Sequence, residues 1–271
     1  MTGRRSWHWW TGRASALLLL LSTAVGSQPV VAKAQALPVV SGYGRPIHFS
    51  GYDWLAKIST VRVGPGPNYF SDSEDNVWID AEQRLHLRVT QDASGNWNCA
   101  EVVLQQSFGY GTYRFQLDGP PRDLDDNVVL GLFTWNDDSA ENHREMDIEF
   151  ARWGERAAPN GRYTVQPYQQ TEHIFNFDQP LVGAQTTHQL EWQPGRATFR
   201  GWMGWNSGPT TSENLIAEHV FESGIPKPGG EQTRMNLWLN AGLAPVDGEG
   251  TEVVINLFEF VPAAAATSLD I

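Results

Sequence analysis

Apolar and polar residues alternate at every second position along most of this chain, and this alternation limits the folds open to it. "LHLRVT" at 85–90 places Leu85, Leu87 and Val89 on one face of a strand, and "GTYRFQLDG" at 111–119 alternates in the same way. No long stretch follows the helical period of roughly 3.6 residues. Many short strands, separated by turns that contain glycine and proline, predict an all-β sandwich or barrel.

One segment departs from this alternation. "NVVLGLFTW" at 127–135 is apolar throughout, so we interpret it as a strand buried on both faces. Pro194-Gly195 predicts a turn between two further strands. All-β folds often reach this chain length as one unit, so the pattern favours a single domain.

The first 36 residues have the layout of a secretory signal peptide. Basic residues such as Arg4 and Arg5 precede the apolar run "ALLLLLSTAVG", and Ala34 and Ala36 form a small-x-small cleavage pattern. The alternative is a membrane anchor, but the run is too short to span a bilayer. We therefore predict a signal peptide at 1–36, one folded domain at 37–262 and a flexible tail at 263–271. The protein is expected to be secreted, or periplasmic in a Gram-negative cell.

The chain is acidic once the signal peptide is removed. Four basic residues leave with it, so 15 Lys and Arg face 31 Asp and Glu, a net charge of −16. This charge argues against nucleic acids and anionic membranes as partners. We expect a monomer with no membrane contact after cleavage. The single cysteine, Cys99, lies in an apolar strand, which favours a packed thiol over a reactive one.

The segment "EMDIEF" at 145–150 places three carboxylates on one face of a strand. Its apolar residues alternate with Glu145, Asp147 and Glu149, so the acids share the face away from the core. One interpretation is a solvent-exposed acidic face, and another is a calcium site, although a wrapping loop is missing. The third is acid–base chemistry. Closely placed carboxyls raise one another's pKa, which gives a proton donor beside an ionised nucleophile, as glycoside hydrolysis requires.

The spacing of the two glutamates sets a condition on that chemistry. Glu145 and Glu149 lie roughly 13 Å apart along a flat strand. A retaining mechanism needs their carboxyls about 5–5.5 Å apart. Both must therefore lean inward over Asp147, which a concave sheet face favours, and Asp147 could then bond to Glu145. Nine of the 12 tryptophans lie after residue 36. Such an excess predicts aromatic platforms for sugar rings.

The acidic motif resembles the E-x-D-x-E signature of glycoside hydrolase family 16, which includes lichenases and laminarinases. Further segments resemble bacterial lichenases in the same order: "NCAEV" (98–102), "FGYGTY" (108–113), "LFTW" (132–135), "LEWQPG" (190–195) and "MNLW" (235–238). The resemblance implies a concanavalin A-like jelly roll of two curved antiparallel sheets with a concave substrate cleft. It also implies a retaining mechanism, in which Glu145 is the nucleophile, Glu149 is the acid and then the base, and Asp147 assists.

The resemblance also suggests residues that bind substrate. Asn236 and Trp238 lie opposite Met235 and Leu237 on their strand, and the resemblance places their face near the cleft. The alternatives are a surface charge for Glu101 and packing or loop roles for the others. The substrate-binding candidates are Glu101, Trp135, His143, Trp153, Tyr168, Asn236 and Trp238.

Several positions depart from the lichenase pattern. Arg144 replaces an Asp and should lie on the core side of its strand or at the strand's mouth, where it would lower a carboxylate pKa. Val103 replaces an arginine that holds substrate, which weakens the case for mixed-linkage glucan. Asn256 stands where some members have a calcium-binding Asp. No cofactor or metal is therefore predicted, and a structural calcium is left open.

Together these features predict a secreted endo-β-glycan hydrolase, a glycosidase that acts on a β-1,3- or mixed β-1,3-1,4-glucan. One alternative is a transglycosylase, which would use the same residues and pass the sugar to another chain. The other is a non-catalytic, lectin-like carbohydrate-binding protein. A binding module has no reason to keep both glutamates, and both are present here.

Overall fold

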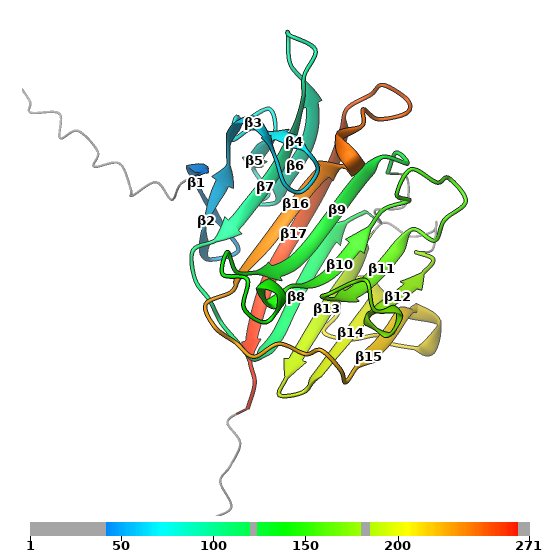
Figure 1. Cartoon of the computed structure of the whole chain (residues 1–271). Helices are drawn as coiled ribbons and strands as arrows, with labels where there is room; N and C mark the ends of the chain where they lie inside the picture. The colour runs from blue at the N-terminus through cyan, green and yellow to red at the C-terminus, as the bar shows by residue number, and fades with distance from the viewer. Residues whose placement is uncertain (1–41, 120–123, 180–184, 265–271) are drawn as a thin grey trace, which may run out of the picture. The chain divides into compact units, whose positions relative to one another are not determined.

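Strands account for most of the regular structure in residues 42–119, 124–179 and 185–264, the parts of the chain that the computed structural model describes (Figure 1). The predicted signal peptide and residues 265–271 of the predicted tail lie outside these ranges. The strands of the first half are β1 (Tyr43–Phe49), β2 (Tyr52–Lys57), β3 (Ser59–Val63), β4 (Asn68–Phe70), β5 (Val77–Ile79), β6 (Leu85–Gln91), β7 (Trp97–Leu104), β8 (Gly111–Asp118) and β9 (Val128–Trp135). Those of the second half are β10 (Met146–Phe150), β11 (Gly161–Val165), β12 (Ile174–Phe177), β13 (Gln185–Gln193), β14 (Arg196–Met203), β15 (Leu215–Phe221), β16 (Gln232–Leu239) and β17 (Thr251–Pro262). Short 3₁₀ helices span Asn142–Arg144, Thr171–His173, Ser212–Asn214 and Asn240–Gly242.

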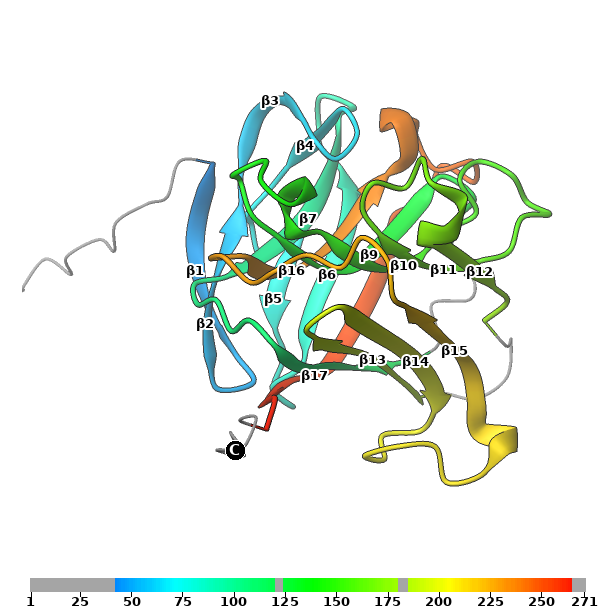
Figure 2. The ribbon, with the colours of Figure 1, turned by 60° about the horizontal axis from the view of Figure 1, so that its bottom comes forward.

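The strands form two antiparallel sheets that lie face to face, as the turned view in Figure 2 shows. The front sheet has the order β1-β2-β7-β16-β9-β10-β11-β12. The back sheet has the order β5-β6-β17-β8-β13-β14-β15. The short β4 pairs in parallel with β7. The predicted all-β jelly roll is confirmed. Within the described ranges, no helix is long and apolar enough to cross a bilayer.

The hydrophobic core lies between the two sheets and follows the alternation of the sequence. Leu85, Leu87 and Val89 of the back sheet are fully buried there, as are Met146 and Ile148 of the front sheet. Each strand therefore gives one face to the core and leaves the other for solvent or a site.

The prediction that the apolar strand β9 is buried on both faces is confirmed from Val128 to Leu132, all of which are buried, but not at its end, where Phe133 and Trp135 are half-buried. Val128, Leu130 and Leu132 belong to the core, as expected. Gly131 and Phe133 point the other way and line a pocket on the front sheet. An apolar residue on the second face of a strand therefore does not prove that a second layer covers it.

Two local predictions are confirmed. In the β13–β14 hairpin Gln193 pairs with Arg196, so Pro194-Gly195 is the turn, and Gly195 takes a φ of 70° that glycine adopts without strain. Cys99 is buried in the core, and burial raises the pKa of its thiol to about 12, so it is a packing residue and not a nucleophile.

Candidate active site

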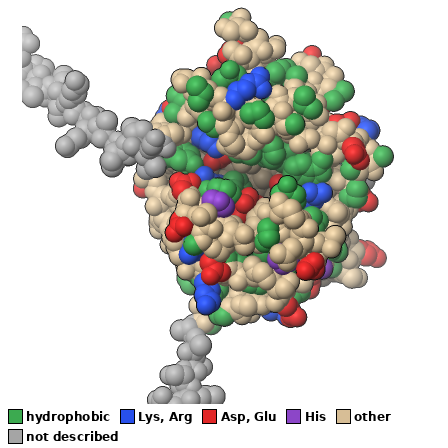
Figure 3. All heavy atoms as spheres, in the orientation of Figure 1, with side chains coloured by type: hydrophobic (Ala, Val, Ile, Leu, Met, Phe, Trp, Pro, Cys, Tyr) green, Lys and Arg blue, Asp and Glu red, His purple; other side chains and the backbone are tan. Residues whose placement is uncertain are grey.

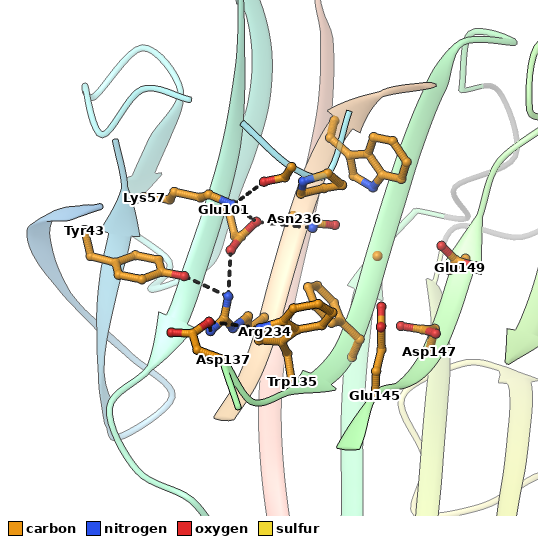
Figure 4. Close-up of a pocket in the computed structure, with 15 residues that line it drawn as sticks. Tyr43, Lys57, Glu101, Trp135, Asp137, Glu145, Asp147, Glu149, Arg234 and Asn236 are labelled. Atoms are coloured by element: carbon orange, nitrogen blue, oxygen red, sulfur yellow. Dashed lines mark hydrogen bonds and ion pairs between the residues drawn. The ribbon is translucent and has the colours of Figure 1, made fainter. Parts of the chain in front are cut away.

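The three carboxylates of the acidic motif line a cleft of about 420 Å³ on the front sheet. Asp147 and Glu149 belong to β10, where they pair with Phe133 and Gly131 of β9, and Glu145 immediately precedes the strand. Figure 3 shows a hollow near the centre of this face, bordered by hydrophobic and acidic side chains. Figure 4 shows the three carboxyls on one side of the pocket and a polar network around Glu101 on the other. The structure therefore brings together the acids that the sequence predicted as catalytic.

A left-handed turn delivers the chain to Glu145. Residues 141–144 have φ values of 53, 51, 62 and 54°, although none of them is glycine. Each such residue costs about 1 kcal/mol. Hydrogen bonds offset this, since the carbonyl of His143 accepts from the Asn136 backbone at 2.7 Å and that of Arg144 accepts from Thr134 Oγ1 at 2.8 Å. Glu145 then returns to extended backbone at the start of β10.

Arg144 lies at the mouth of the strand, one of the two places expected for it. Its Nε donates to the carbonyl of Lys227 at 3.1 Å and its Nη1 to that of Ala140 at 3.2 Å. The expected lowering of a carboxylate pKa beside it is wrong, because the pKa of Glu145 is raised and the arginine that opposes the rise is Arg234. Arg144 therefore anchors the turn.

Burial raises the pKa values of all three carboxyls. The pKa of Glu145 rises to about 8 through burial and the charge of Glu149, while a hydrogen bond with Asp147 and the charge of Arg234 oppose the rise. Burial and the two glutamates hold the pKa of Asp147 well above its usual range, against a hydrogen bond from Gln166 Nε2 at 3.3 Å. Burial raises the pKa of Glu149 to about 7, against the charge of Arg162. The group therefore holds protons at neutral pH. The sequence predicted one raised pKa from neighbouring charge, whereas all three are raised and burial is the largest cause of each rise.

Gly131 opens the floor of the cleft beside Glu149. It pairs with Glu149 on one side and with Asn236 on the other. A Cβ at this position would lie 2.5 Å from Asn236 Oδ1. The missing side chain therefore leaves room next to a catalytic candidate, and the buried Oδ1 has no hydrogen-bond partner in the described part of the chain. Such an acceptor suits a ligand hydroxyl.

Glu101 is the centre of a buried polar network and not a surface charge. Only 1% of its side chain is exposed. Lys57 Nζ lies 3.0 Å from its carboxylate, Asn236 Nδ2 3.4 Å and Arg234 Nη1 3.6 Å. Arg234 also donates to the hydroxyl of Tyr43 at 2.8 Å. These contacts fix the positions of Asn236 and Arg234 across the cleft from the three acids.

The aromatic candidates divide into lining and supporting residues. Trp135 and Trp238 line the cleft. His143 stacks on Trp135 with centroids 4.1 Å apart and an interplanar angle of 7°, so it covers one face of that ring. Trp153 meets Trp238 edge-on at 6.2 Å. His143 and Trp153 therefore support the lining rings and are not themselves part of the cleft wall.

Tyr168 was predicted to bind substrate, but the structure places it outside the cleft. It is 55% exposed and does not line the cleft, and its backbone N–H donates to Gln166 Oε1. Asn256, the position compared with a calcium ligand, donates to Gln116 Oε1 at 3.1 Å. Among the described residues, no group of three or more His, Cys, Asp and Glu side chains is placed to hold a metal ion.

Comparison with known proteins identifies the fold. No family model matches the chain. A β-glucanase of Paenibacillus polymyxa is 25% identical over 170 residues, which span 62% of this chain and 64% of the relative, just under two thirds of its length. The solved β-glucanase of Bacillus licheniformis is 18% identical, with a TM-score of 0.56, over 81% of this chain and 99% of that one. The fold is that of the β-glucanases. The predicted resemblance to glycoside hydrolase family 16 is confirmed.

Proteins with the glucanase fold include both a glucanase and a protein described as a pseudo-glucanase. An endo-1,3-β-glucanase of Streptomyces sioyaensis is 16% identical, with a TM-score of 0.55, over 83% of this chain and 98% of that one. A Mycobacterium tuberculosis protein, 18% identical with a TM-score of 0.57 over 82% of this chain and 100% of that one, is described as an immunostimulatory antigen and pseudo β-1,3-glucanase. The fold alone therefore does not decide whether the chain is catalytic.

Some residues that line the cleft were not predicted from the sequence. For one of them, the alternation of the strand could have indicated that it faces the cleft. Arg234 shares the face of Asn236 and Trp238 by the two-residue period, so the alternation could have identified it. Lys57 and Tyr43 come from strands far away in the sequence and gave no local signal. The lining residues missed from the sequence are Tyr43, Lys57, Gly64, Pro65, Gly131, Phe133, Asp137 and Arg234.

Proposed function

We propose that this protein is an endo-acting glycosidase, which hydrolyses internal glycosidic bonds of a β-1,3- or mixed β-1,3-1,4-glucan. The observation that carries the proposal is the group of three carboxyls in the wall of an open cleft, of which Asp147 is buried and the two glutamates are half-buried, and whose pKa values are all raised. The β-glucanase relative and the glucanase fold support the choice of substrate. The predicted signal peptide would bring the enzyme to a polymer outside the cytoplasm.

The reaction takes place in two displacements. Glu145 attacks the anomeric carbon in its ionised form, which the hydrogen bond with Asp147 and the charge of Arg234 favour, while the carboxyl of Glu149 gives its proton to the departing glycosidic oxygen. Because the pKa of Glu145 is about 8 and that of Glu149 about 7, only a minor fraction of the free protein carries this pair of charge states at pH 7. The C–O bond of the glycoside breaks and a glycosyl ester with Glu145 forms. Glu149, now ionised, then takes a proton from water, which attacks the anomeric carbon and releases Glu145. Asp147 bonds to Glu145 and adjusts its charge.

The experiment measures new reducing ends from the purified protein on barley β-glucan, laminarin, xyloglucan, agarose and carrageenan. We expect release on a β-glucan, its loss in Glu145→Gln, and unchanged release in the control Glu155→Gln, since Glu155 is exposed and outside the cleft. Binding without release on any glycan would contradict hydrolysis and favour the lectin-like protein. Longer products without new reducing ends would indicate a transglycosylase.

A further inference from the structure

A second hollow, of about 470 Å³, lies between β1 and β5 and shares no lining residue with the cleft. Arg45 and His48 of β1 form one side of it, and Trp78 of β5 forms the other. Glu74, from the loop before β5, lies on its rim. The hollow therefore combines one aromatic ring with several polar groups.

The ring of Trp78 is held in place from behind. Trp78 pairs directly with His86 of β6, and the two rings stack with centroids 4.5 Å apart at 17°. His86 is fixed in turn, because its Nδ1 lies 2.8 Å from Glu252 Oε1 and its Nε2 lies 3.0 Å from Asp80 Oδ2. One face of the indole is thus covered by a fixed imidazole, and the half-buried side chain lines the hollow. A ring that is already oriented loses little conformational entropy on binding.

The rim carries donors and acceptors of both charge signs. Arg45 is anchored by its Nε, which donates to the carbonyl of Asp72 at 2.8 Å. His48 pairs with Asp53 at 2.9 Å. Glu74 is exposed, and among the described residues no hydrogen bond or ion pair engages its carboxylate. A rim of mixed sign favours a neutral ligand that is rich in hydroxyls over an anion.

We propose that Trp78 and this rim form a second glycan-binding site, which holds a neutral β-glucan chain outside the cleft. The proposal rests on the proposed function, since it takes the same polymer as the ligand. A pyranose ring presents an apolar C–H face to the indole and hydroxyls at its edge to Arg45 and Glu74. The site would keep the enzyme on a long or insoluble polymer while the cleft acts on it.

The test compares long and short substrates. Bound fractions on insoluble β-1,3-glucan are measured in the Glu145→Gln background with and without Trp78→Ala, and hydrolysis is measured in the parent and the single variant. We expect Trp78→Ala to lower the bound fraction and the rate on insoluble glucan at least threefold, and to leave the rate on a soluble β-1,3-glucan hexasaccharide within twofold. The control Trp205→Ala, which changes a half-buried tryptophan outside both hollows, should alter neither.

A second measurement covers the case in which Trp78→Ala does not fold. Trp78→Phe keeps an aromatic ring stacked on His86 but has no indole N–H. The indole N–H signal that disappears from the NMR spectrum of this variant therefore belongs to Trp78. In the Glu145→Gln protein that signal should shift on titration with the hexasaccharide, and an unmoved signal would overturn the second site. Full hydrolysis with unchanged polymer binding in Trp78→Ala would overturn the second site and leave the proposed function intact. Absence of both hydrolysis and binding in every protein would overturn the proposed function as well.

Discussion

Replacement of Glu145 by Gln should make the protein more stable, by an amount that grows with pH. The pKa of Glu145 is about 8 in the folded protein against an ordinary value of 4.5. Between these two values the folded state binds more protons than the unfolded state, so the free energy of unfolding falls as the pH rises. The contribution of protonated Glu145 to the free energy of unfolding is fully present below about pH 4.5. It is lost as the pH rises through the folded pKa of about 8.

The size of the effect follows from the pKa shift. One unit of pKa corresponds to about 1.36 kcal/mol, so an ionisable Glu145 lowers the free energy of unfolding at pH 7 by about 3 kcal/mol. Gln keeps the shape of the side chain and removes its charge. We therefore expect Glu145→Gln to exceed the parent by about 2–3 kcal/mol at pH 7. This corresponds to roughly 5–10 °C in Tm for a domain of this size. At pH 4 the two proteins should be equally stable.

The measurement is thermal and urea unfolding, followed by circular dichroism, at several values between pH 4 and 8.5. Glu155→Gln is the matched control, because it makes the same chemical change at an exposed position and should not alter the pH dependence. A Glu145→Gln protein that is less stable than the parent at pH 7.5 would refute the reasoning. So would a stability difference that stays constant across the pH range.

Two further predictions concern catalysis. Arg234→Met removes a charge that lowers the pKa of Glu145, so the acidic limb of kcat/KM against pH should move up by about one unit. An unmoved limb would contradict this role. Gly131→Ala places a methyl group 2.5 Å from Asn236 Oδ1 and should reduce kcat/KM on β-glucan about tenfold or more. The control Gly208→Ala, where a Cβ would contact nothing within 4 Å, should retain the parent rate, and equal rates in both variants would show that the cleft floor tolerates a side chain.

The sequence predicted what depends on local periodicity. Met146, Ile148 and Phe150 are buried and the acids between them face the cleft, because a two-residue period assigns faces wherever apolar and polar residues alternate. The same argument could not divide β9 into its two faces. Both faces of β9 are apolar there, and the one that carries Gly131 lines the cleft.

The contacts of Glu101 show why the rest of the site escaped prediction. Lys57 is 44 residues away in sequence and reaches Glu101 only because β2 pairs with β7 in one particular register. Alternation says which face a residue occupies but not which strands are neighbours or how they are aligned. Tyr43, which bonds to Arg234 across 191 residues, depends on this pairing and also on those of β1 with β2 and of β7 with β16.

The acidic strand shows how the fold can hold a group that destabilises it. β10 is only five residues long, and three of its side chains are fully buried in the core beneath the cleft. Burial of that apolar face stabilises the strand by several kcal/mol, about 1.5–3 for each large side chain. This offsets part of the cost of the raised pKa values on its other face and of the left-handed turn that precedes it. Stability and turnover are therefore opposed at Glu145. If the carboxyls were held for catalysis, the variant that gains stability at neutral pH should be the one that loses turnover. A variant that gained stability and kept full activity would leave the carboxyl without a function.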